Sequence, residues 1–153
     1  MAPSYQGTRC RARAASAAER AAIDDARFLA SLEDCSLPPG RFDHAAHVRA
    51  GYLYLRRSPF PQATAAMCAA VERYARSLGR PDRYHETITV AFMALINQQL
   101  RQDAGADSWE RFRARHPQLL ASDALLAYYP RAVLESRAAR ACFTLLPLAG
   151  SNQ

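Results

Sequence analysis

Three of the four histidines in this chain occupy positions from which they could share one site. His44 and His47 are three residues apart, and His85 belongs to a later segment. On a helix, side chains three residues apart lie on one face, so two imidazoles with this spacing can converge on one ion or one substrate. The fourth histidine, His116, precedes a proline, and we expect it in a loop or at the surface.

The chemistry that suits these three histidines is that of neutral imidazole. We expect each of them in the first turn of a helix, where the partial positive charge lowers the pKa of imidazole. Neutral imidazole binds divalent metals and acts as a base. Three histidines with an open fourth position form a usual catalytic zinc site, and the same donors suit copper, iron or nickel. The sequence therefore predicts a divalent transition metal, zinc first, held by His44, His47 and His85.

Polar side chains next to His85 are candidates for the catalytic step. Glu86 follows directly and could act as general base on a metal-bound water. The residue at the second histidine position of an HExxH motif is Thr89, so the zinc-protease signature is absent. Tyr84 and Thr89 could add hydroxyl groups, and we count both with Glu86 as catalytic candidates.

Three further residues are candidates for substrate binding. Tyr74 is expected at the same end of the molecule as the histidines. Arg137 and Arg140 are three apart in the last expected helix and could together hold a carboxylate or a phosphate. The expected partner is therefore a small-molecule substrate.

Two alternatives to a metal enzyme stay open. The protein could be a metal-free enzyme in which His85 and Glu86 transfer protons in an isomerisation, cyclisation or elimination. It could also be a helical module that binds a small ligand or another protein without catalysis, with its histidines packed as core residues.

The elements that must position these residues are predicted to be helical throughout. Apolar residues recur at helical spacing, and proline or glycine separates the helical segments. Asp43, Asp82 and Ser108 are suitable N-caps. The expected helices cover residues 16–33, 43–57, 63–78, 84–102, 108–115, 123–129 and 131–141.

The direction of the chain is what would bring the histidines together. In an up-and-down bundle the second and fourth helices start at the same end, so His44, His47 and His85 should be neighbours there. The prediction is an all-α fold, an up-and-down four-helix bundle with short additional C-terminal helices. Residues 1–14 are expected to form a disordered arm, and residues 15–148 a single helical domain.

Composition narrows the classes of partner. The net charge is +6, but all 20 basic residues are arginines spread along the chain, so we do not expect nucleic-acid binding. No apolar run reaches the roughly 18–20 residues needed to cross a membrane, and no apolar secretory signal opens the chain, so we expect a cytoplasmic protein. The four cysteines form no close pair and predict no disulfide framework. Alanine-rich faces leave a homo-oligomer possible.

Several segments resemble a known group of sequences. Residues 41–49 (RFDHAAHVR) and 84–89 (YHETIT), with Tyr128-Tyr129 and residues 136–140 (SRAAR), are similar to a group of short bacterial proteins with FDHxxH and YHETxT segments. The similarity would extend from about Phe28 to Phe143. It implies an all-helical fold and carries no activity with it.

Overall fold

The computed structural model describes residues 16–146, and within that range every regular element is helical. The all-α prediction is confirmed. The predicted arm over residues 1–14 lies outside the described residues. None of the helices in the described range is long and apolar enough to cross a membrane.

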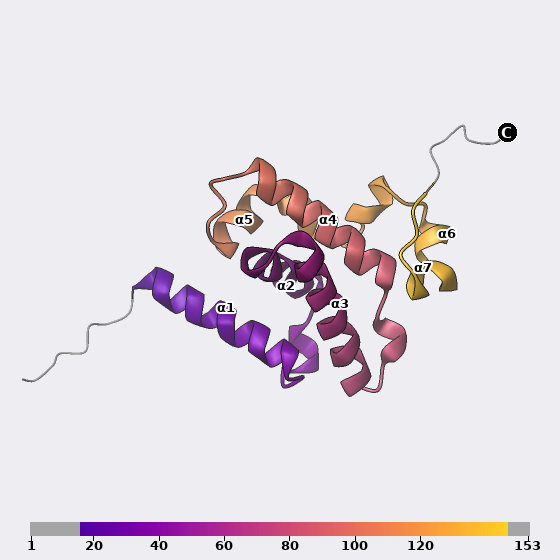
Figure 1. The fold of residues 1–153 in the computed structure, drawn as a ribbon, viewed down its shortest axis with the longest axis horizontal. Coiled ribbons are helices and arrows are strands. Elements are labelled where there is room, and N and C mark those ends of the chain that lie inside the picture. The colour runs from indigo at the N-terminus through magenta and orange to yellow at the C-terminus, as the bar shows by residue number, and fades with distance from the viewer. Residues whose placement is uncertain (1–15, 147–153) are drawn as a thin grey trace, which may run out of the picture.

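Four long helices come first in the chain and short ones follow (Figure 1). The long helices are α1 (Ala17–Glu33), α2 (His44–Arg57), α3 (Phe60–Ser77) and α4 (Glu86–Gln102). The short ones are α5 (Trp109–Arg115), α6 (Arg131–Leu134) and α7 (Arg137–Ala141). Single turns of 3-10 helix lie over Pro39–Arg41, Pro81–Arg83, Pro117–Leu120 and Ala124–Ala127.

Local capping explains where several of these helices begin. The Asp43 side chain accepts the Ala46 N–H at the start of α2, and the Ser108 side chain accepts the Arg111 N–H at the start of α5, as predicted. The segment expected as one helix over 131–141 is two helices. The Ser136 side chain accepts the Ala139 N–H, and this local bond starts α7 separately from α6.

The core lies where α2, α3 and α4 pack against one another. Gly51 permits a close approach of α2 to α4, because a Cβ there would lie 2.8 Å from Ile96 Cδ1. Helix α1 contributes Leu29 and Leu32 to the core near its C-terminal end, and its first half extends away from the other helices (Figure 1). The packing of α2, α3 and α4 therefore sets the position of the candidate site.

Candidate functional site

A cavity of about 290 Å³ lies where the starts of α2 and α4 meet the end of α3. All three histidines singled out from the sequence, His44, His47 and His85, line it. Tyr74 and Thr89 line it as well. The shared end of α2 and α4 thus brings five of the candidate residues to one place.

The rest of the wall includes both apolar and charged residues. Phe42 packs its ring edge-on against Tyr74, with centroids 5.4 Å apart. Arg80 and Arg83, from the connection between α3 and α4, add two guanidinium groups that the sequence analysis did not single out. Their position in the sequence, in the turn just before His85, could have marked them as candidates for this site. Asp43 is the one carboxylate among the described residues that line the cavity. The apolar residues of the wall, besides Phe42, are Pro39, Val71, Ala75, Leu78 and Ile88.

His85 has both ring nitrogens engaged in hydrogen bonds. It is the N-cap of α4, where its Nδ1 accepts the Ile88 N–H at 3.2 Å. Its Nε2–H donates to the Leu134 carbonyl at 2.7 Å. The side chain is buried, and this burial lowers the pKa of His85. Asp82, predicted as the cap, lies instead in the 3-10 turn that Pro81 opens, so that prediction was wrong.

His44 is held by a contact from far along the chain. Its Nε2 lies 2.9 Å from the Leu119 carbonyl oxygen, and because a carbonyl only accepts, Nε2 carries the proton. The ring also packs against Phe92, with centroids 4.9 Å apart. His44 is therefore oriented by contacts with two other helical segments.

His47 differs from the other two because its Nε2 is buried and has no hydrogen-bond partner among residues 16–146. The ring lies near both Phe42 and Phe92, with centroids 5.8 and 6.4 Å away. Burial, together with the nearby His44, lowers the pKa of His47 to about 4. His47 is therefore neutral at pH 7 and carries an unused nitrogen beside the cavity.

The histidines as arranged do not form an open three-ligand metal set. Within the described part of the chain, no group of three His, Cys, Asp or Glu side chains is placed to hold an ion. His85 would have to give up one of its two hydrogen bonds to become a ligand, and the Nε2–H of His44 already donates to the Leu119 carbonyl. The three-histidine ion site stays a prediction that this geometry does not favour.

Glu86 and Tyr84 are paired with each other and are not among the residues that line the cavity. The Tyr84 hydroxyl donates to the Glu86 carboxylate in a short hydrogen bond. Burial raises the pKa of Tyr84, and hydrogen bonding with Cys68 and Glu86 raises it further. The carboxylate expected to serve as a base is thus engaged by a neighbouring hydroxyl on the α3 side of α4.

The two C-terminal arginines do not act as a pair. Arg140 donates to the Asp82 carbonyl at 2.6 Å and to the Tyr84 carbonyl at 3.3 Å, and so ties α7 to the segment before α4. It lines a second cavity, of about 360 Å³, which shares His85 with the first. Arg137 is exposed on α7 and lines neither cavity.

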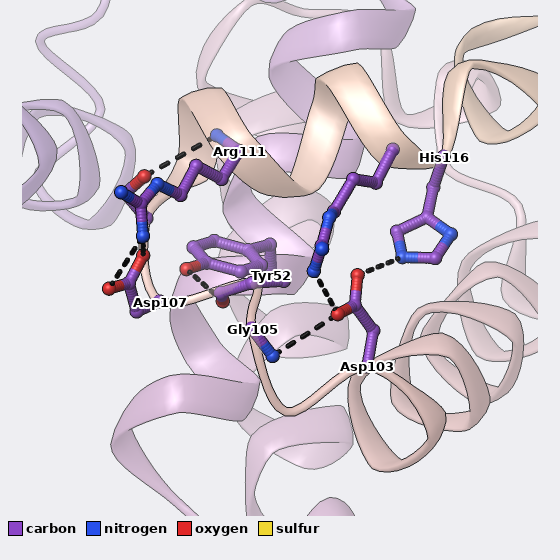
Figure 2. A network of polar contacts seen from close by, with 9 residues as sticks. Tyr52, Asp103, Gly105, Asp107, Arg111 and His116 are labelled. Atoms are coloured by element: carbon purple, nitrogen blue, oxygen red, sulfur yellow. Dashed lines mark hydrogen bonds and ion pairs between the residues drawn. The ribbon is translucent and has the colours of Figure 1, made fainter.

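A polar network at the other end of α4 accounts for His116 (Figure 2). His116 lies in the connection after α5, as one expected alternative had it, but it is only 9% exposed, which contradicts the other, a surface position. Its Nε2 lies 3.1 Å from an oxygen of Asp103, whose other oxygen pairs with Arg115 and accepts the Gly105 N–H. The proline that follows His116 opens a 3-10 turn and turns the imidazole inward, over Phe112.

No protein-family model, curated protein or solved structure matches this chain.

Proposed function

We propose that the protein binds a small molecule in the cavity between α2, α3 and α4 and transfers a proton on it through His47, without a metal ion. The observation that carries the proposal is the buried, unpartnered Nε2 of His47 in a ring that lines this cavity. Leaving a buried nitrogen unpaired costs about 1–3 kcal/mol, so such an atom calls for an explanation. A ligand O–H or N–H that donates to this nitrogen would remove the cost.

The step needs a small movement of the imidazole. Nε2 is covered by protein atoms, so the ring has to turn about its broad χ2 torsion before that nitrogen faces a ligand. A base works best when its pKa lies near the working pH. The pKa of about 4 therefore makes His47 a hydrogen-bond acceptor in the free protein. A negative charge on the ligand would raise that pKa toward the useful range.

The other polar groups of the wall would orient the ligand. The Tyr74 hydroxyl already donates to the Leu37 carbonyl at 2.9 Å, which fixes the hydroxyl and leaves its oxygen able to accept. The Thr89 side chain lines the cavity one turn into α4. The rings of His85 and His44 are each held by a hydrogen bond to a backbone carbonyl. They would shape the cavity as fixed side chains and would not act as bases.

The test is a screen of small metabolites by ligand-observed NMR, followed by incubation of the bound compounds in D₂O. We expect at least one compound to exchange a carbon-bound proton for deuterium, at a rate that chelator treatment leaves unchanged. His47→Gln should lower that rate at least about a hundredfold, the smaller end of what a general base contributes. Arg101→Gln, in the last turn of α4, serves as the control. Full exchange in His47→Gln would contradict the proposal.

A divalent ion at His47 is the second candidate. The observation in its favour is the same free nitrogen of a neutral imidazole, with His44 one helical turn away. Elemental analysis of the purified and of the metal-reconstituted protein tests it. About one ion per chain, lost in His47→Ala, would support the ion, and exchange activity that disappears with chelator would rule out the metal-free mechanism.

A further inference from the structure

We propose that the ligand of the His47 cavity is a small organic anion, a carboxylate or a phosphate monoester, whose charged group binds Arg83 and Arg80. This inference rests on the proposed function for the location of the ligand and deepens it by naming the chemical class. It depends on the charges, the size and the apolar wall of the cavity.

The first support is the charge on the wall. The Arg83 side chain has no hydrogen-bond or ion-pair partner in the described part of the chain. The Arg80 side chain has one long contact in the described part of the chain, 3.8 Å from its Nε to an oxygen of Asp82, between exposed side chains. Exposed pairs of this kind contribute little, so both guanidinium groups remain available to an anion. An arginine fork can bind a carboxylate or a phosphate through two parallel hydrogen bonds.

The negative charge of Asp43 does not cancel the positive charges of Arg80 and Arg83. Asp43 lies at the N-terminus of α2, where its carboxylate accepts the Ala46 N–H at 2.8 Å. The partial positive charge of the helix start offsets part of the carboxylate charge there. The remaining titratable groups of the wall are Tyr74 and the three histidines, none of which is anionic at pH 7. The wall is therefore cationic overall.

Size and wall composition limit the rest of the ligand. At about 290 Å³, the cavity lies at the small end of ligand pockets, which suits a compact metabolite better than a nucleotide or a polymer chain. Phe42, Val71 and Ile88 add apolar side chains to the wall that also holds the arginines. A short aliphatic or aromatic skeleton would pack there with its anionic group at the arginines.

The experiment measures anion binding to the full-length chain by calorimetry, with inorganic phosphate and benzoate as probes and NaCl at matched ionic strength as the reference. We expect saturable binding that Arg83→Gln weakens about tenfold or more, the effect of losing a charged hydrogen bond. Arg83→Lys keeps the charge but cannot form two parallel hydrogen bonds, so its anion affinity should lie between those of the wild type and Arg83→Gln. Arg101→Gln should bind like the wild type, because Arg101 lies at the opposite end of α4.

Each outcome decides the inference. Binding no stronger than that of chloride would overturn it, and so would an Arg83→Gln variant that binds as tightly as the wild type. The thermal midpoint of each variant shows that the fold is kept. Anion binding at Arg83 without any deuterium exchange would uphold this inference and overturn the proton transfer. Deuterium exchange that does not depend on Arg83 would uphold the proton transfer and overturn this inference.

Discussion

The Nε2–H of His85 donates to the carbonyl oxygen of Leu134 at 2.7 Å, across 49 residues of chain. The same ring accepts the Ile88 N–H through Nδ1, so one imidazole both caps α4 and fastens α6 to it. This side chain also forms part of the wall between the two cavities. The histidine that the sequence marked as a ligand has, in this arrangement, a positioning role.

This double role predicts that His85→Ala is strongly destabilising. Loss of the cap and of the bond to Leu134 should together lower the free energy of unfolding by about 2–3 kcal/mol, measured by urea denaturation. His85→Asn keeps a capping oxygen for the Ile88 N–H and should lose about half as much. A His85→Ala variant as stable as the wild type would contradict the positioning role.

Thr87 predicts a second effect on the attachment of the C-terminal segment. Its hydroxyl donates to the Cys142 carbonyl and accepts the Thr144 N–H, each at 3.0 Å. Thr87→Val should cost about 1–3 kcal/mol and speed amide hydrogen exchange at Thr144. Thr64→Val is the matched control, because the Thr64 hydroxyl is buried without a partner among the described residues. Equal losses in the two variants would count against the attachment.

His47 predicts a pH dependence of stability. Burial, with the nearby His44, lowers its pKa to about 4 in the folded chain, against an ordinary value of 6.5. Between these values the unfolded state binds more protons, so stability is full above about pH 6.5 and falls as the pH drops toward 4. The pKa difference corresponds to about 3 kcal/mol.

The contribution of His47 is isolated by difference. His85 also has a lowered pKa and contributes in the same direction, so the wild-type curve contains both. Chemical denaturation at several pH values should show that the wild type loses more stability than His47→Gln between about pH 6.5 and pH 4. Parallel curves over this range would show that His47 is not buried as a neutral imidazole.

The network at Asp103 predicts a contrast with Asp107, four residues further along the chain (Figure 2). Asp103 is mostly buried and bonds His116, Arg115 and the Gly105 N–H. Asp103→Ala should lose about 2 kcal/mol of stability, since it leaves the buried imidazole of His116 without its carboxylate partner. Asp107→Ala removes an exposed pair with Arg111 and should lose under about 0.5 kcal/mol. Similar thermal midpoints for the two variants would contradict this account.

Much of the architecture follows from local signals. The caps at Asp43 and Ser108 mark helix starts because a side-chain oxygen there satisfies a free backbone N–H. The shared position of His44, His47 and His85 followed from helix direction alone. The cap at His85 could not be read locally, because Asp82 is the residue with the better capping propensity and only Pro81 and the tertiary contacts exclude it.

The hydrogen bonding of the histidines depends on residues far away in the sequence. The sequence could not indicate that His44 bonds the Leu119 carbonyl 75 residues away, or that Leu134 bonds His85. These two contacts separate His47, with its unused nitrogen, from its two neighbours. The pairing of Glu86 with Tyr84, by contrast, joins two residues only two positions apart.

The central claim is that a small molecule binds in the cavity beside His47, and a backbone amide map tests it most directly. The ¹H–¹⁵N spectrum of the full chain is recorded during titration with benzoate, against NaCl at equal ionic strength. We predict saturable shifts at His47, Val71, Arg83 and Ile88, and none at the Asp103–His116 end of α4. Shifts that do not saturate, or that gather away from these four residues, would contradict the claim.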